Sequence, residues 1–294
     1  MTTLDAPRGT PKFGRFRFRS RGGHSKEQAS LLWAVTAWVV GLIVFYPVLH
    51  MFLTGFKTEA DAVELPPKLI FDATLENYRA IFDFDFSPFF VNSIIASGVS
   101  TLLVMLLGVP AAYAVAIRPT KKAKDILFFF ISTKFLPPAG VIAPLFIIYR
   151  DLDLLSTMRG LIILYTSLNL PIAIWMLRSF FEEIPRDVID AARVDGAGVF
   201  RELTQIMIPM IWPGLVATAF ISIIFAWNEF FFAISLASAR TGTVPIFLVR
   251  FVTSEGLFWA KLAASSTMAV LPIILLGWVA QRQLVRGLSM GAVK

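Results

Sequence analysis

The chain has 294 residues, of which 56% are hydrophobic and 16% are charged. Soluble domains average about 25% charged residues, so this composition argues against a water-soluble fold and for a membrane protein. The sequence has no cysteine, which excludes disulfides and cysteine nucleophiles, and its two histidines, His24 and His50, have no partner at zinc-site spacing. We therefore expect no metal site and no catalytic site in this chain.

Residues 1–29 form a basic tail. Seven Lys and Arg residues lie there among Gly, Pro and Ser, within a chain of net charge +7. Such a composition cannot bury a core, and no aromatic stacking module accompanies the arginines. We therefore expect a cytoplasmic tail near anionic lipid rather than a nucleic-acid-binding segment. The apolar run that follows is long enough to span a bilayer, so a cleavable signal peptide is not expected.

Six apolar stretches after the tail are long enough, or nearly so, to cross a bilayer as helices. They run over residues 30–53, 88–117, 126–149, 160–180, 210–237 and 262–282. The sequence therefore predicts an all-α protein with six transmembrane helices in one permease-sized domain, 30–294. Only the third and fifth stretches hold a charged residue well inside, Lys134 and Glu229. We favour a structural role for both, as an interhelical ion pair or as side chains that reach an interface.

The Lys and Arg residues are divided unevenly between the connecting segments. Alternate segments, beginning with the tail, hold 18 of them, and the segments on the opposite side hold 8. Because cytoplasmic loops are rich in Lys and Arg, both termini are predicted to be cytoplasmic. The longest outer segment, 54–87, is either a docking surface for an external partner or a solvated loop.

The segment 181–209, between the fourth and fifth spans, has the pattern of an element that protrudes into the cytosol. Pro185 is placed to begin a helix and Gly196 to end it, since glycine adopts a left-handed conformation without strain. A second amphipathic turn follows and ends at Pro209. Its apolar face is expected to hold Phe200, Leu203, Ile206 and Met207, with Arg201, Glu202 and Gln205 elsewhere. A surface both apolar and charged requires a cytosolic partner.

This spacing resembles the permease subunits of ABC importers. Their cytoplasmic loop reads Glu-Ala-Ala, glycine four residues after the second alanine, then nine residues before Ile-x-Leu-Pro. Here Asp190-Ala191-Ala192, Gly196 and Ile206-Met207-Ile208-Pro209 stand at that spacing. In that family the loop is the coupling helix, which seats in a groove of the nucleotide-binding subunit. The resemblance implies that the residues that couple to the ATPase are Asp190, Ala191, Ala192, Asp195, Gly196, Ile206, Ile208 and Pro209.

Within that loop, the resemblance implies that Asp190 pairs with a cation of the partner, that the two alanines allow close approach, and that Gly196 sets the bend. The likeness extends from about residue 30 to Lys294 and looks like the carbohydrate-uptake branch of these permeases. Marks of that branch are Asn92-Ser93, Ala111-Ala112-Tyr113-Ala114, Trp227-Asn228-Glu229 and the final stretch 285–294. The stretches 132–134, 169–177 and 255–262 look like permeases for mannitol, sorbitol and related polyols.

The family resemblance also implies an assembly in the bacterial inner membrane with the type I importer permease fold. Its partners would be a second homologous permease subunit, two ATP-binding subunits and an external solute-binding protein. This chain has no Gly-Lys dipeptide and hence no Walker A loop, so ATP and Mg²⁺ would be bound by the partner subunits.

Polar side chains within the spans are candidates for the solute pathway, because polar groups in a membrane are costly and usually face a cavity or a neighbour. The candidates are Asn92, Asn169, Trp227, Asn228 and Glu229. Amides and a Trp face suit an uncharged polyol. An oligosaccharide permease and a stand-alone secondary transporter remain alternatives. The latter predicts an internal repeat and broken helices around a midplane ion site. A membrane enzyme is disfavoured because catalytic pairs are missing.

Overall fold

The computed structural model describes the backbone of residues 23–253 and 256–290, and the side chains of residues 31–253 and 257–285. The chain forms two units, Met1–His50 and Met51–Lys294. Helix α1 (Gly23–Thr54) makes up the described part of the first unit and extends into the second. The part of this helix that is long and apolar enough to cross a membrane is Leu31–Thr54. Residues 1–22 of the predicted basic tail lie outside the described residues.

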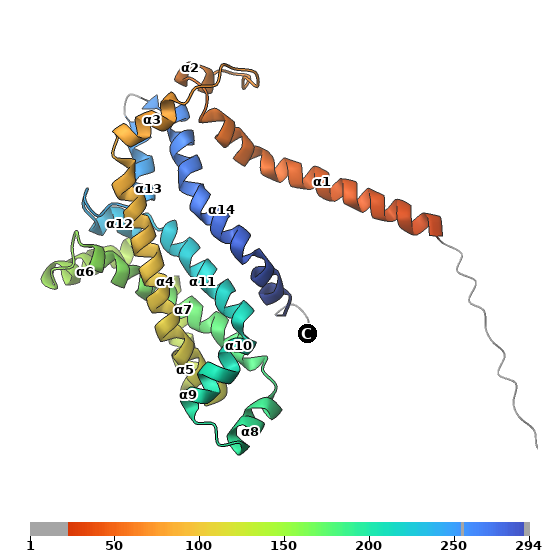
Figure 1. Ribbon diagram of the computed structural model, residues 1–294. Helices are drawn as coiled ribbons and strands as arrows, with labels where there is room; N and C mark the ends of the chain where they lie inside the picture. The colour runs from red at the N-terminus through yellow and green to blue at the C-terminus, as the bar shows by residue number, and fades with distance from the viewer. Residues whose placement is uncertain (1–22, 254–255, 291–294) are drawn as a thin grey trace, which may run out of the picture. The chain divides into compact units, whose positions relative to one another are not determined.

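The second unit consists of helices and one small hairpin (Figure 1). Its first elements are α2 (Glu59–Ala62), α3 (Glu76–Asp83), α4 (Phe86–Ile117), α5 (Ala123–Ser132), η1 (Thr133–Phe135), α6 (Pro138–Asp151), α7 (Met158–Glu182) and α8 (Arg186–Val194). The rest are α9 (Val199–Arg201), the π-helix η2 (Glu202–Met207), α10 (Ile208–Met210), α11 (Trp212–Trp227), α12 (Phe231–Leu236), α13 (Val244–Leu248), η3 (Val249–Phe251), β1 (Val252–Thr253), β2 (Gly256–Leu257) and α14 (Trp259–Met290). The antiparallel strands place Val252 opposite Leu257.

Helices α4, α7, α11 and α14 form the frame of this unit. The first two pack along each other, and α11 lies against both of them and against α14 (Figure 1). Hydroxyl groups on these helices donate to the carbonyl four residues earlier, as from Thr218 to Gly214 and from Thr267 to Ala263, at 2.8 Å each. They are thereby satisfied without water. Gly214 also meets the ring of Phe180 where a methyl group would clash, which lets α11 approach α7 closely.

Four helical segments are long and apolar enough to cross a membrane, namely Leu31–Thr54, Phe86–Ile117, Met158–Glu182 and Trp259–Val285. Two bent pairs also pass this test, Ala123–Phe135 with Pro138–Asp151 at 100° and Val199–Met210 with Trp212–Trp227 at 81°. The all-α prediction is confirmed, and six spans are reached if each bent pair counts as one.

The third and fifth apolar stretches, 126–149 and 210–237, are each divided between separate helices. The third breaks between η1 and α6, where Pro137 and Pro138 cannot donate backbone hydrogen bonds. The fifth begins after the bend at Ile211 and ends at Trp227, before the separate helix α12. The two charged residues of these spans therefore lie at or beside breaks and not within continuous helices.

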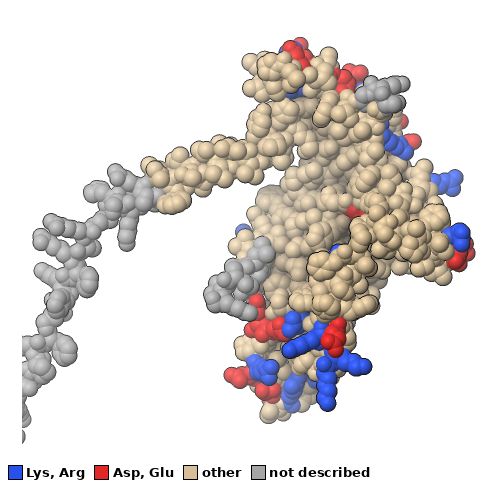
Figure 2. Space-filling model, turned by 180° about the vertical axis from the view of Figure 1, so that it is seen from behind, with Lys and Arg blue, Asp and Glu red and all other residues tan. Residues whose placement is uncertain are grey.

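On the face drawn in Figure 2, charged side chains are most concentrated at the two ends of the second unit, further ones lie along its right edge, and the rest of the surface between the ends is almost uncharged. At one end the C-terminal ends of α4 and α7 meet α8 and η2, and at the other lie α2, α3 and α13 (Figure 1). Large apolar side chains of the long helices remain exposed, including Leu106 at 61% and Trp278 at 69%. Such surface suits contact with lipid or with another membrane subunit.

The predicted outer segment 54–87 is a structured cap at the end opposite α8. The buried Asn77 amide donates to the carbonyls of Gly55 and Lys57 at 3.0 and 2.7 Å. The Glu59 carboxylate accepts hydrogen bonds from the first turn of α14, at the backbone nitrogens of Ala260 and Lys261. Lys68 donates to Asp61, and this bond lowers the pKa of the Asp61 carboxyl. These bonds give the segment a defined structure and tie it to α14.

Candidate functional site

Helix α8 is a short amphipathic helix whose ends follow from local chemistry. It begins directly after Pro185, whose φ of −57° already suits a helix, one residue later than predicted. Asp187 in the first turn and Arg193 in the last turn complement the helix dipole. The chain then turns at Gly196, which has a left-handed φ of 76°. The predicted helix and glycine bend are confirmed.

The residues predicted to couple to an ATPase divide between two faces of this segment. The Asp190 side chain is 71% exposed and Ala191 is exposed, whereas Ala192 is buried beside Ile189 against the core. One of the two alanines is therefore available to a partner and the other packs within the chain. Of the remaining residues, the exposed ones are Asp195, Gly196 and Pro209, and the half-buried ones are Ile206 and Ile208.

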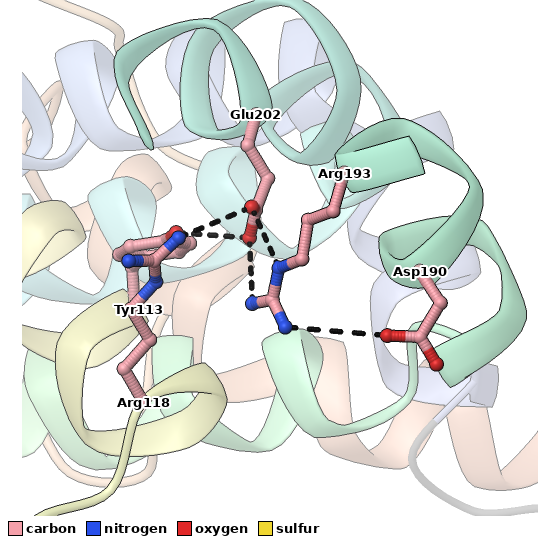
Figure 3. Close-up of polar contacts among 5 residues, drawn as sticks. All are labelled: Tyr113, Arg118, Asp190, Arg193 and Glu202. Atoms are coloured by element: carbon pink, nitrogen blue, oxygen red, sulfur yellow. Dashed lines mark hydrogen bonds and ion pairs between the residues drawn. The ribbon is translucent and has the colours of Figure 1, made fainter. Parts of the chain in front are cut away.

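A buried carboxylate ties this segment to α4 (Figure 3). Glu202, at the first position of η2, is 0% exposed. Its Oε1 accepts hydrogen bonds from the Tyr113 hydroxyl at 2.9 Å and from Arg193 Nη2 at 3.3 Å. Its Oε2 accepts from Arg193 Nε at 3.2 Å and from Arg118 Nη2 at 3.4 Å. We call these four residues the Glu202 cluster. Arg193 Nη1 also lies 4.0 Å from Asp190.

The Glu202 cluster was not predicted, and two residues of this turn lie on the opposite side from the expected one, whereas Met207 is buried and Arg201 and Gln205 are exposed as expected. Sequence analysis placed Glu202 away from the apolar face and Phe200 on it, but Glu202 is buried and Phe200 is 79% exposed. The first reason is that η2 is π-helical, and a π turn holds more residues than the 3.6 on which the pattern was read. The second is that cationic and hydroxyl donors from α4 and α8 satisfy the carboxylate inside. The hydrogen bond with Glu202 also raises the pKa of the Arg193 guanidinium.

A cavity of about 460 Å³ lies beside the Glu202 cluster, between the ends of α4 and α7 and the inner side of α8. Its polar lining includes Glu182, Arg186, Asp190 and Arg193. Because side chains do not fill this space, α8 packs on the core over only part of its inner surface.

A second cavity, of about 240 Å³, lies beside the break between η1 and α6 and at the C-terminal end of α11. Lys134 lines it from η1, Asn169 from α7, and Glu229 from the turn after α11. Lys134 Nζ donates to the carbonyl of Leu168 at 2.7 Å, and the Asn169 amide donates to that of Tyr165 at 2.9 Å. Each charged or amide group thus has a backbone partner and still faces the cavity. We call this space the central cavity.

Glu229 has a local structural task at the central cavity. Its two carboxylate oxygens accept the backbone N–H groups of Phe232 and Ala233, each at 2.9 Å, at the start of α12. The expected ion pair between Glu229 and Lys134 is not among the ion pairs of the described residues, although both side chains line the same space. Their structural role is therefore met through the backbone and not through each other.

The other three predicted pathway residues lie elsewhere. The Asn92 amide donates to the carbonyls of Arg240 and Gly242, both at 2.9 Å, and so holds that loop on α4. Trp227 is buried, and its Nε1 donates to the Ala269 carbonyl of α14 at 3.2 Å. Asn228 is exposed, and its amide bonds to the carbonyl of Ile224, one turn earlier, at 2.8 Å. Of the five predicted residues, the structure brings Asn169 and Glu229 together.

No group of His, Asp and Glu residues suited to a metal ion occurs within the part of the chain that the structure describes. The described polar clusters are the Glu202 cluster at one end and the central cavity inside. The first joins elements mechanically, and the second presents polar groups to an open space. This combination suits a protein that moves a solute.

Comparison with known proteins gives this arrangement a family. Residues 104–287 match the family model described as binding-protein-dependent transport system inner membrane component. The trehalose transport system permease protein SugB of Mycobacterium tuberculosis is 35% identical over 89% of this chain and 97% of that protein. The trehalose/maltose transport system permease protein MalG of Thermococcus litoralis is 30% identical over 90% of this chain and 96% of that protein.

A solved structure shares the fold. A chain of a bacterial ABC transporter involved in the import of the acidic polysaccharide alginate superposes with a TM-score of 0.71, over 94% of this chain and 100% of that chain, at 23% identity. Broken helices, which sequence analysis associated with a secondary transporter, therefore occur here within an importer fold. The chain belongs to the binding-protein-dependent transport system inner membrane component family, and it is a permease subunit of the sugar-uptake branch of ABC importers.

Proposed function

We propose that the end formed by α8 and η2 docks on an ATP-binding subunit and faces the cytosol, with both termini on that side. The observation that carries this proposal is the exposed outer face of α8, which presents Asp190 and Ala191 and is followed by the left-handed Gly196. Val194 at the end of this helix is 87% exposed, so the face offers apolar as well as charged surface. The excess of Lys and Arg in the segments on this side supports the orientation.

The proposed assembly contains a second homologous permease subunit, two ATP-binding subunits and an external solute-binding protein. ATP and Mg²⁺ are bound by the ATP-binding subunits. When those subunits close, they displace α8, and the spans attached to it change the side to which the central cavity opens. The Asp190 carboxylate pairs with a cation of the docked subunit. The cap built from α2 and α3, at the opposite end, meets the solute-binding protein.

The proposed solute is a sugar or a sugar alcohol such as mannitol or sorbitol. The central cavity offers an amide and backbone-anchored polar groups, which suit hydroxyls and bind them weakly enough for release. A disaccharide is the second candidate, because trehalose and maltose appear in the names of relatives.

The docking proposal is tested by reversing the charge of Asp190. The chain is co-expressed with its ATP-binding subunits and purified in detergent, and the subunits that co-purify are quantified. Asp190→Arg is expected to lower their yield by about tenfold, since it sets like charges against each other. The matched control is Asp125→Arg, the same change at an exposed position of α5 at the same end. Equal yields for both variants would contradict the docking face.

The solute proposal is tested by uptake of radiolabelled mannitol and sorbitol into cells that carry the complete importer. Excess unlabelled polyol is expected to abolish uptake, and maltose or trehalose to leave it unchanged. If trehalose or maltose inhibits uptake at a lower concentration than the unlabelled polyols do, a disaccharide is favoured as the solute. Asn169→Ala is expected to raise the KM for uptake without lowering the amount of protein in the membrane.

A further inference from the structure

Helix α8 needs something more than apolar packing to transmit a displacement to the membrane. It contacts the core through Ile189 and Ala192, and the cavity of about 460 Å³ lies beside those contacts. Apolar contacts have no preferred direction, so a helix held by them alone can slide over its support. The Glu202 cluster supplies the directional contacts on this side of α8.

The geometry of the Glu202 cluster joins three pieces of the chain at one point (Figure 3). Arg193 extends from α8, Tyr113 lies in the last turns of α4, and Glu202 begins η2. The guanidinium of Arg193 approaches the carboxylate side-on through two nitrogens, at 3.2 and 3.3 Å. A paired contact of this kind fixes orientation as well as distance. Because the carboxylate is fully buried, it cannot exchange these partners for water without the site opening.

We propose that Glu202 is a positioning residue for transport: it locks α8 and η2 to α4, so that a displacement of α8 moves α4 as part of the same rigid body. This inference rests on the proposed docking of α8 on an ATP-binding subunit. Asp190, the residue proposed to meet that subunit, lies 4.0 Å from Arg193. A continuous polar path therefore leads from the exposed face of α8 through Arg193 and Glu202 to Tyr113 on α4.

The route from α4 to the central cavity is short. Along its length α4 packs on α7, which supplies Tyr165 and Asn169 to the cavity lining. At its far end Asn92 and Ser93 hold the loop before α13, with the Val244 N–H donating to Ser93 Oγ at 2.8 Å. A movement imposed at the α8 end of α4 thus reaches both the cavity and the opposite end of the unit.

The first test uses the complete importer in proteoliposomes and measures three quantities: ATP-binding subunits retained, ATP hydrolysed and solute taken up. With Glu202→Ala, retention and hydrolysis are expected to stay within about twofold, while uptake falls about tenfold, so that ATP consumed per solute rises. A parallel fall of all three quantities would show that Glu202 only maintains the fold, and unchanged uptake would show that it does nothing. Either result overturns the proposal.

Milder variants keep the test informative if Glu202→Ala does not assemble. Tyr113→Phe removes one hydroxyl and Glu202→Gln removes the charge, and each is expected to raise ATP consumed per solute. The double variant is expected to raise ATP consumed per solute by less than the product of the two single-variant factors, because both substitutions act on the same contact. The matched control is Glu182→Gln, which alters an ion pair within α7, with Arg178 at 2.6 Å, and is expected to change nothing.

The second test measures rigidity directly. The chain has no cysteine, so a spin-label pair can be introduced at two chosen positions, Arg186→Cys on α8, away from the proposed docking face, and Leu106→Cys on α4, both exposed. Pulsed electron resonance on the complete importer is expected to give one narrow distance with and without ATP, and a broadened or shifted distance with Glu202→Ala. A distribution unchanged by Glu202→Ala overturns the proposal. If the ATP-binding subunits do not stay bound to the permease when Glu202 is intact, the proposed docking of α8 is refuted instead.

Discussion

The Glu202 cluster and the central cavity both hold charged groups, but they satisfy them in opposite ways. In the cluster, side chains from separate elements converge on one carboxylate and leave no water-filled space at it. In the cavity, Lys134 and Glu229 each bond to nearby backbone and leave one side open. Long-range side-chain partners hold elements together, whereas local backbone partners leave the elements free to part. The contrast separates a part that transmits motion from a part that accommodates a solute.

The largest effect is expected from Glu202→Ala. Removing one partner of a buried charge pair costs about 3–5 kcal/mol, and the partial exposure of Arg193 and Arg118 moves the expected loss to about 3 kcal/mol. The free energy of unfolding, measured by denaturant titration in mixed micelles, should fall by this amount. A loss no larger than that of Glu182→Gln would mean that the cluster does not hold the elements together.

Gly196→Val is the next largest. A Cβ atom at this position has open space around it, so the cost comes from the left-handed backbone, at about 1–2 kcal/mol, and a β-branched side chain adds to it. Gly196→Asn should be tolerated better, because Asn adopts this conformation more readily. Uptake is expected to be lost with Val and largely kept with Asn, with the chain inserted in the membrane in both cases. Equal uptake for the two variants would show that the backbone bend at Gly196 is not required for coupling.

Glu229→Ala should cost about 1 kcal/mol, the usual loss for a helix-capping acceptor, since water in the cavity can replace the lost oxygens. Denaturant titration measures this loss, which should be clearly smaller than the loss in free energy of unfolding caused by Glu202→Ala. Uptake assays should show a raised KM with ATP consumption unchanged. A loss of stability as large as that of Glu202→Ala would mean that the two interior sites are not different in kind.

Trp227→Phe is expected to have the smallest effect. It removes the hydrogen bond from Nε1 to the Ala269 carbonyl, for about 1 kcal/mol or less, and retains an aromatic ring against Phe90. The KM for uptake should not change, because Trp227 does not line the central cavity. A clear change in KM would bring this residue back to the solute pathway.

The long helices could be predicted from the sequence because their signal is local. An uninterrupted apolar run predicted a span over 88–117, and α4 is Phe86–Ile117; a run over 160–180 predicted a span, and α7 is Met158–Glu182. The spacing of Pro185 and Gly196 likewise predicted α8 and its bend. Apolar composition says nothing of direction, however, and it did not predict the angles of the two bent pairs, because the residues on both sides of each break are apolar.

The Glu202 cluster could not be predicted from the local pattern. Its partners are 9, 84 and 89 residues from Glu202 along the chain, and only packing brings them together. Tyr113 did appear among the family marks, but nothing in a single sequence pairs it with a glutamate on another element. Asn169 and Glu229, two of the five candidates for the solute pathway, line the central cavity, in keeping with the cost of polar groups in a membrane, which limits the places where they can lie.

The π-helical turn Glu202–Met207 has a consequence for insertions and deletions. Because an α-helix advances by about 100° per residue, removing one residue after Glu202 from this turn would restore an ordinary helix and rotate Glu202, together with α8, by roughly that angle relative to α11. The number of residues in this turn therefore sets the rotation of α8 relative to α11. A one-residue deletion here should uncouple the permease even though it removes no side chain that touches the ATPase or the solute.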